Sequence, residues 1–172
     1  AYVFLGDCRE VLKGLPDTSI DSIVTDPPYE LNFMSKKWDN TGIAYDVTVW
    51  LECLRVLKPG GHILAFGGSR TFHRLAVAIE DAGFEIRDTI AWISSKTFPK
   101  SLNIEKAMDK AGMNGSVAKG WGTGLKQVVE PVVLGRKPFE GSVAENFERW
   151  GVGALNIDAT RINNLSEKEK NW

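Results

Sequence analysis

The feature that most constrains this chain is a pair of adjacent prolines placed directly after a short apolar run. Residues 20–25 combine three apolar and three polar side chains in a roughly alternating pattern, and the run ends at Asp26-Pro27-Pro28-Tyr29. Proline lacks a backbone N–H and fixes φ, so two prolines in succession cannot continue a hydrogen-bonded ladder. The pattern therefore predicts a strand whose carboxyl end presents Asp26 and Tyr29 on a rigid turn.

Strand patterns alternate with helical patterns along most of the chain. Apolar side chains recur at helical spacing between Val47 and Leu57 and between Phe72 and Ile79. Alternation of this kind predicts an α/β fold with a mostly parallel sheet and helices on both faces. Pro131 indicates an edge position or a bulge for the last strand. The predicted strands are residues 2–5, 20–25, 62–66, 84–93 and 128–134.

The length and the hydrophobic content predict one domain. A chain of 172 residues with 43% hydrophobic residues can bury one core. We expect a single domain over residues 1–165, with residues 94–127 as an inserted helix and loop region. Residues 166–172 are rich in charge and are expected to form a tail.

The composition argues against several classes of protein. The two cysteines, Cys8 and Cys53, and the two histidines, His62 and His73, do not form a disulfide framework or a zinc cluster. No metal site is therefore expected. The lack of a disulfide framework favours a reducing, cytoplasmic setting, and the lack of an apolar stretch of membrane-spanning length predicts no membrane contact. The net charge of −1 requires any contact with nucleic acid to come from local Lys and Arg side chains.

The Asp26-Pro27-Pro28-Tyr29 turn is suited to holding a flat group that carries an amine. The Asp26 carboxylate and the Pro27 carbonyl can each accept a hydrogen bond from an amine, and the prolines keep that carbonyl rigidly aimed. The Tyr29 ring offers a face on which a nucleic-acid base can stack. An alternative interpretation is that the turn only ends the strand, with Asp26 capping neighbouring N–H groups.

Several segments resemble the DNA N-4/N-6 amino-methyltransferase family, and in particular its phage and prophage members with the catalytic turn near the amino end. The similar segments are Leu5-Gly6-Asp7-Cys8, residues 20–29, residues 55–68, residues 82–88, residues 98–101 and Glu130-Pro131-Val132-Val133. The resemblance implies a Rossmann-like methyltransferase sheet with an antiparallel strand near the carboxyl-terminal part. It also implies a phage- or prophage-encoded enzyme of DNA methylation and restriction-modification, acting in a bacterial host cell.

The same resemblance implies the reaction and its partners. S-adenosylmethionine would be the methyl donor and DNA the acceptor, with adenine N6 favoured over cytosine N4 because the turn begins with Asp26. Asp26, Pro27, Pro28 and Tyr29 would be the catalytic residues, and Asp7, Cys8 and Asp26 would lie near the cofactor. Methylation of RNA or of a protein glutamine is a further alternative, because related proline turns act on amide nitrogens too.

A loop after the turn carries candidate contacts to the substrate. Phe33, Lys36, Lys37 and Trp38 lie in this segment, where the lysines can meet phosphate and Trp38 can stack on a base or cover the pocket. The alternative is that the aromatic side chain simply packs the loop. The recognition sequence in DNA does not follow from these residues.

One motif of the family is missing from the expected places. The family's cofactor loop has the form Phe-x-Gly-x-Gly after a strand, whereas Gly120-Trp121-Gly122-Thr123-Gly124 and Trp150-Gly151-Val152-Gly153 are both predicted to be loops. We therefore expect an incomplete sheet, and a fragment or a chain whose cofactor site is completed by a second subunit or by self-association. The alternative function is a catalytically incomplete methyltransferase-like chain that binds DNA or a partner.

Overall fold

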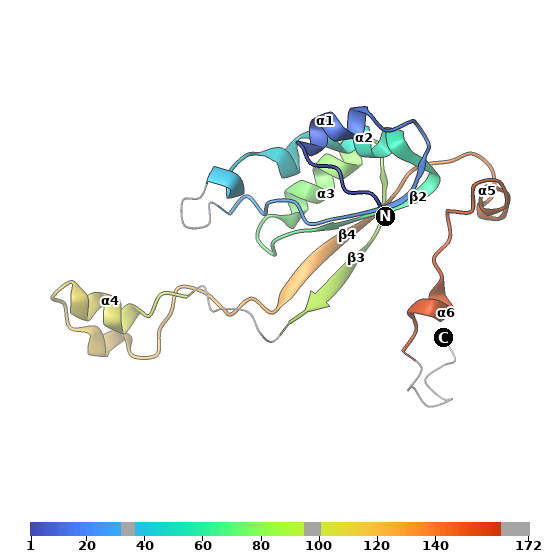
Figure 1. Ribbon diagram of the computed structural model, residues 1–172. Helices are drawn as coiled ribbons and strands as arrows, with labels where there is room; N and C mark the ends of the chain where they lie inside the picture. The colour runs from blue at the N-terminus through green and yellow to red at the C-terminus, as the bar shows by residue number, and fades with distance from the viewer. Residues whose placement is uncertain (32–36, 95–100, 163–172) are drawn as a thin grey trace, which may run out of the picture.

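A four-stranded sheet forms the centre of the computed structural model, which describes residues 1–31, 37–94 and 101–162 (Figure 1). In spatial order the strands are β1 (Ile20–Thr25), β2 (Leu57–Phe66), β4 (Val129–Arg136) and β3 (Glu85–Ile93). β1 pairs in parallel with β2, and β4 lies antiparallel to both β2 and β3. Three strands therefore share one direction and β4 runs the other way. This arrangement confirms the predicted α/β class with an antiparallel strand toward the carboxyl end.

Three helices cover one face of the sheet: α1 (Cys8–Lys13), α2 (Val47–Val56) and α3 (Phe72–Asp81) (Figure 1). α2 begins at Asp46, whose carboxylate accepts a hydrogen bond from the Thr48 N–H. The hydrophobic core lies between α2, α3 and the sheet, where apolar side chains lose nearly all contact with water. Its most buried members include Trp50, Leu75, Ile79, Ile63, Ala65 and Val133.

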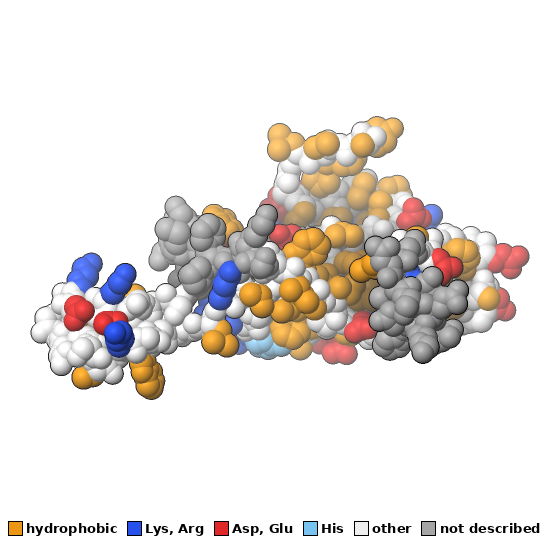
Figure 2. Space-filling view, turned by 90° about the horizontal axis from the view of Figure 1, so that it is seen from below, with side chains coloured by type: hydrophobic (Ala, Val, Ile, Leu, Met, Phe, Trp, Pro, Cys, Tyr) orange, Lys and Arg blue, Asp and Glu red, His pale blue; other side chains and the backbone are white. Residues whose placement is uncertain are grey.

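The opposite face of the sheet is less covered than predicted. Among the described residues, helices α1 to α3 all lie on one face, and Figure 2 shows hydrophobic side chains spread over the other. Along β2, buried Ile63 and Ala65 alternate with half-buried neighbours, as expected for a strand whose two faces have different surroundings. The prediction of helices on both faces is wrong for the part of the chain that the structure describes.

Residues 2–5 do not form the predicted strand. The segment carries no strand hydrogen bonds, and the side chains of Tyr2, Val3, Phe4 and Leu5 are each at least 65% exposed. The outer edge of β1 also has no strand partner among the described residues. A strand exists only when a neighbour completes its ladder, and an apolar pattern cannot supply that neighbour.

Pro131 lies in a central strand, whereas its presence predicted an edge or a bulge. The Pro131 carbonyl accepts a hydrogen bond from the N–H of Gly67, which directly follows β2. The backbone N and C=O of one residue point to the same neighbouring strand, so the N–H that Pro131 lacks would face the β2 side and not β3. Regular pairing with β2 ends at Phe66 opposite Val132. The proline therefore removes no hydrogen bond from the β3–β4 ladder and is tolerated inside the strand.

The second half of the chain contains more helix than predicted. α4 (Ile104–Lys110) and the 3-10 helix η4 (Gly115–Ala118) precede β4, and α5 (Val143–Trp150) and α6 (Ile157–Thr160) follow it. α5 starts with a capping box in which Ser142 and Glu145 bond each other's backbone N–H groups. No helix in the described ranges is long and apolar enough to cross a membrane. The predicted tail of residues 166–172 lies outside those ranges.

Candidate active site

The Asp26-Pro27-Pro28-Tyr29 turn leaves the carboxyl end of β1 beside the end of β2, where Thr25 is paired with Ala65. The Thr71 Oγ1 atom, near the start of α3, donates a hydrogen bond of 2.8 Å to the Tyr29 carbonyl. A Cβ atom on Gly68 would lie 3.2 Å from Cδ2 of Tyr29, which is a tight contact. Glycine at position 68 therefore lets the tyrosine ring approach the β2–α3 turn closely.

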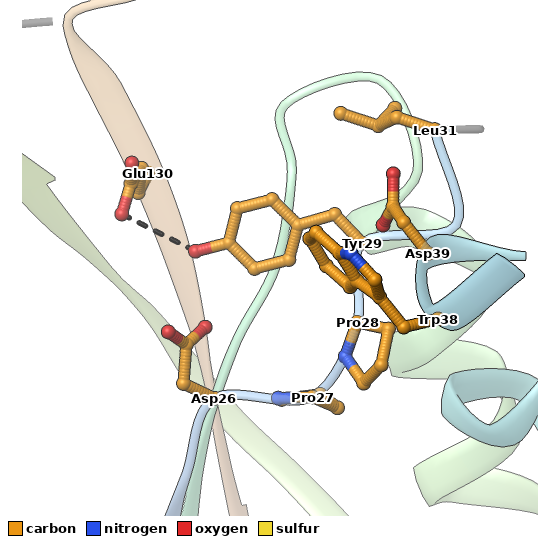
Figure 3. A pocket seen from close by; sticks show the side chains of 8 residues that line it. All are labelled: Asp26, Pro27, Pro28, Tyr29, Leu31, Trp38, Asp39 and Glu130. Carbon is orange, nitrogen blue, oxygen red and sulfur yellow. Dashed lines mark hydrogen bonds between the residues drawn. The ribbon is translucent and has the colours of Figure 1, made fainter. Parts of the chain in front are cut away.

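The turn forms one wall of a cavity of about 510 Å³ (Figure 3). In Figure 3 the Asp26 and Glu130 carboxylates lie together on one side of the Tyr29 ring, and Trp38 lies on the other side. The Trp38 indole is 59% exposed, so much of its surface is open to a ligand. The lining residues are Asp26, Pro27, Pro28, Tyr29, Leu31, Trp38, Asp39 and Glu130.

A hydrogen bond across the cavity fixes the Tyr29 ring. The Tyr29 hydroxyl donates to Oε2 of Glu130, near the start of β4, with a distance of 3.2 Å. Partial burial raises the pKa of the Tyr29 phenol, and the negative charges of Asp26 and Glu130 raise it further. The phenol therefore keeps its proton at neutral pH and acts as a hydrogen-bond donor.

Glu130 is a site residue that sequence reasoning missed. The sequence indicates it only as part of the Glu130-Pro131-Val132-Val133 segment, with no role in the site. It lies 101 positions after Tyr29, and only the placement of β4 beside β2 brings the two side chains together. The sequence signal that could have identified Glu130 is an acidic residue next to a proline at the start of an apolar strand.

A second cavity, of about 460 Å³, lies on the other side of the turn and reaches α1 and α2. Asp26, Pro27 and Pro28 line both cavities, so the turn separates them. The second cavity is mostly apolar, with Leu12 and Ile23 among its walls. The arrangement gives two ligands access to the turn from different sides.

Two of the three residues predicted near the cofactor line one cavity, and the third, Asp7, lies next to Cys8 at the start of α1. Cys8 and Asp26 line the same second cavity. The Asp7 carboxylate instead caps α1 and accepts hydrogen bonds from the Arg9 backbone N–H and guanidinium. The hydrogen bonds from Arg9 lower the pKa of Asp7 to about 2, so this carboxylate is ionised at neutral pH. Its engagement with Arg9 makes Asp7 a structural cap in this arrangement.

The predicted substrate-binding loop is only partly described. Trp38 lines the first cavity in the 3-10 helix η2 (Lys37–Asp39). Phe33 and Lys36 lie outside the described residues, and Lys37 is described by its backbone alone. Both glycine clusters are loops: Gly151 ends α5 with a φ of 72°, and Gly122 forms an isolated bridge with Asn103. Among the described residues, no group of three or more His, Cys, Asp and Glu side chains is arranged to hold a metal ion.

Comparisons with known proteins agree on one family. The sequence profile of the DNA methylase family for N6 and N4 amino groups matches residues 20–170. The type II methyltransferase M.HindIII of Haemophilus influenzae is 29% identical over 121 residues, covering 67% of this chain and 39% of that protein. M.HinfI of the same species is 31% identical over 116 residues, covering 56% of this chain and 32% of that protein. The chain thus spans 39% and 32% of the lengths of these two relatives.

Solved structures share the fold. TTHA0409 from Thermus thermophilus, in complex with S-adenosyl-L-methionine, superposes with a TM-score of 0.53 at 23% identity, covering 84% of this chain and 57% of that one. The cytosine-N4-specific PvuII DNA methyltransferase superposes with a TM-score of 0.54 at 18% identity, covering 95% and 58%. Both similarities concern the arrangement of strands and helices.

Proposed function

Because this chain belongs to the DNA methylase family for N6 and N4 amino groups, we propose that it carries the catalytic turn of an enzyme that methylates an exocyclic amino group in DNA. The observation that carries the proposal is the cavity beside Asp26-Pro27-Pro28-Tyr29, in which Tyr29 is held between Thr71 and Glu130. We assign residues 1–165 to one catalytic domain, with residues 94–127 as an insertion.

Each residue of the turn has a role in this reaction. A base extruded from the duplex stacks on the Tyr29 ring, which offsets part of the few kcal/mol needed to flip it. The Asp26 carboxylate and the Pro27 carbonyl accept hydrogen bonds from the amine and orient its lone pair. Methyl transfer would form the nitrogen–carbon bond as the sulfur–carbon bond of the donor breaks, and the proton lost by the amine would pass to water. Asp26 acts chiefly by orientation, because transfer to a charged sulfonium needs proximity more than a strong base.

The second cavity is the proposed place for the methyl donor. S-adenosylmethionine, when bound, supplies a methyl group on a positively charged sulfur. The apolar walls formed by Leu12 and Ile23 suit a flat ring, and Asp26 at the end of the cavity suits a cationic centre. The described residues offer no glycine-rich loop at this cavity to hold the polar parts of the donor. A further chain segment or a second subunit is therefore the proposed source of those contacts.

Adenine is the proposed target. The turn begins with aspartate, which the family resemblance associates with adenine N6, whereas serine is associated with cytosine N4. Synthetic duplexes in which only the adenines, or only the cytosines, are left unmethylated test this choice directly. Transfer of label to cytosine amino groups alone would reject the adenine assignment.

The deciding experiment measures transfer of a tritiated methyl group from S-adenosylmethionine to unmethylated DNA. We expect Asp26→Ala to lower the rate by about 10²–10³-fold, because one preorganised acceptor for the amine is lost. Asp21→Ala is a matched control on the same strand, since its carboxylate binds Lys58 at the surface. Equal rates for the Asp26→Ala variant and the control would contradict the proposed role of the turn.

A second candidate function is a subunit that binds DNA or a partner without catalysis. It is favoured by the absence, within the described ranges, of a glycine-rich loop at the second cavity. Calorimetric titration with S-adenosylmethionine separates the two candidates. Binding of one donor per chain to the isolated protein supports the enzyme and would reject the non-catalytic subunit.

A further inference from the structure

The insertion between β3 and β4 ends in a small lobe, formed by residues 101–125, that projects from the sheet (Figure 1). We propose that this lobe is a DNA-contacting arm, in which Lys106, Lys110 and Lys119 meet phosphates and Trp121 stacks against a base. The proposal rests on the proposed function for the choice of DNA as the ligand.

The lobe is built as a defined unit. Its two ends are joined by hydrogen bonds between Leu102 and Thr123 and between the Ile104 N–H and the Trp121 carbonyl. Asn103 caps α4, and the Asp109 carboxylate accepts a hydrogen bond from the Gly115 N–H. A side chain at Gly115 would collide with a backbone carbonyl of α4, so glycine is required there. These contacts define the backbone that presents the side chains of the lobe.

The lobe has an ordered backbone but almost no core of its own. Gly115 is the only buried residue in α4 and η4. Several large apolar side chains point to solvent instead, and Trp121 is 71% exposed. Exposed apolar side chains gathered on a projecting unit indicate a contact surface. The others are Leu102, Met113, Val117 and Leu125.

The charge of the lobe favours a polyanion. Residues 101–125 contain three lysines and two acidic residues, a net charge of +1, whereas the whole chain has −1. The Asp109 carboxylate is already engaged by a backbone N–H. Lys106, Lys110 and Lys119 are exposed and form no ion pair with any residue in the described part of the chain. Lys106 and Lys110 are one helical turn apart and share a face of α4.

A groove beside Trp121 gives the surface the shape for a nucleic-acid strand. It has a volume of about 560 Å³ and is lined by the glycine-rich segment of residues 120–125 together with Ser101 and Asn103. Exposed backbone, hydroxyl and amide groups can bond phosphates and sugars, and an aromatic ring can stack on any base. An apolar protein partner would be matched less well by such a polar groove.

The lobe is also connected to the candidate active site. Five residues after Leu125, the chain reaches Glu130, which lines the first cavity and bonds Tyr29. Figure 2 shows the lobe, at the left, projecting well beyond the sheet and carrying basic side chains in blue, which in residues 101–125 are all lysines. DNA held by the lobe therefore continues toward the cavity that receives the flipped base.

Fluorescence anisotropy with a labelled unmethylated duplex tests the proposal on the full chain. The lobe variant is Lys106→Gln/Lys110→Gln/Lys119→Gln, and the matched control is Lys13→Gln/Arg87→Gln/Arg149→Gln, which removes the same charge elsewhere. We expect the lobe variant to bind DNA more weakly and to reduce the slope of log K against log salt by about one to three. Trp121→Ala should weaken binding by about five- to one-hundred-fold. Circular dichroism checks that each variant remains folded.

The outcomes separate this proposal from the proposed function. If the parent chain binds DNA and the lobe variant matches the charge control, the arm is rejected while methylation is untouched. If the lobe variants lose binding but no methyl group is transferred by the parent chain, the arm stands and the catalytic proposal falls. Self-association of the parent chain that Trp121→Ala abolishes, without any effect on DNA binding, would assign the lobe to a second copy and overturn the proposal.

Discussion

At the scale of single residues, the candidate site depends on how tightly Tyr29 is held. The backbone carbonyl of Tyr29 is bonded by Thr71, its ring lies against Gly68, and its hydroxyl donates to Glu130. A residue held at its backbone, its ring and its hydroxyl group loses little conformational freedom when a base stacks on it. Glu130 thus acts as a positioning residue for the stacking surface, although it follows Tyr29 by 101 positions.

Substitution of Glu130 tests this positioning role. We expect Glu130→Ala to lower base flipping, measured by the fluorescence of 2-aminopurine at the target position, because the ring is released. Glu130→Gln should retain most of the signal, since its amide oxygen can still accept a hydrogen bond from the tyrosine hydroxyl. In a Tyr29→Phe background, Glu130→Ala should have little further effect. Independent, additive effects of the two substitutions would show that Glu130 does not act through Tyr29.

At the scale of secondary-structure elements, α5 is fastened to the beginning of β2 by one buried side chain. Asn146 is 5% exposed, and its amide donates hydrogen bonds to the carbonyls of Pro59 and Val152. β2 starts directly at Leu57, so Lys58-Pro59-Gly60-Gly61 lies within this strand. Glycine is needed at position 60 of this strand because the backbone there lies directly against the Asn146 side chain of α5.

Replacement of Gly60 by alanine should destabilise the protein strongly. Gly60 has a φ of +80°, and a Cβ atom there would overlap Nδ2 of Asn146. Gly42 has a φ of +73° and no atom within 4 Å of such a Cβ, so Gly42→Ala reports backbone strain alone. We expect Gly42→Ala to cost about 1–2 kcal/mol in the free energy of unfolding. Gly60→Ala should cost about 1–3 kcal/mol more, because the Asn146 hydrogen bonds are disturbed. Urea unfolding measures both values, and equal losses would show that the Asn146 contact contributes nothing.

At the scale of the whole molecule, the described helices α1 to α3 leave one face of the sheet and the outer edge of β1 without cover (Figures 1 and 2). The second cavity opens beside this edge, and both Cys8 and Asp26 line it. Cys53, a buried residue of α2, lines the same cavity, and its burial raises the pKa of its thiol to about 12. The exposed thiol of Cys8 and the buried thiol of Cys53 therefore lie at different depths of one cavity.

Alkylation of the thiols tests both the packing and the proposed donor site. With iodoacetamide near pH 8, we expect mass spectrometry to find Cys8 modified in the folded protein. Cys53 should react only after unfolding, because it is buried and remains protonated. Added S-adenosylmethionine should slow the modification of Cys8. An unchanged Cys8 rate at a donor concentration that saturates binding by calorimetry would place the donor elsewhere.

The sequence by itself determined the parts of this protein that local patterns encode. The prolines ended β1 at the Asp26-Pro27-Pro28-Tyr29 turn, and the helical spacing of apolar residues located α2 and α3. Such features depend on neighbours within a few positions, since proline chemistry and burial periodicity act locally. They were sufficient to predict the α/β class and the residues of the turn.

Only the tertiary structure decided which distant segments became partners. Placing β4 between β2 and β3 brought Glu130 to Tyr29 and made Pro131 acceptable in a central strand. Residues 2–5 carried a strand pattern yet remained unpaired among the described residues. Strand order and register arise from long-range pairing, in which many weak contacts are satisfied together, so no local pattern specifies them.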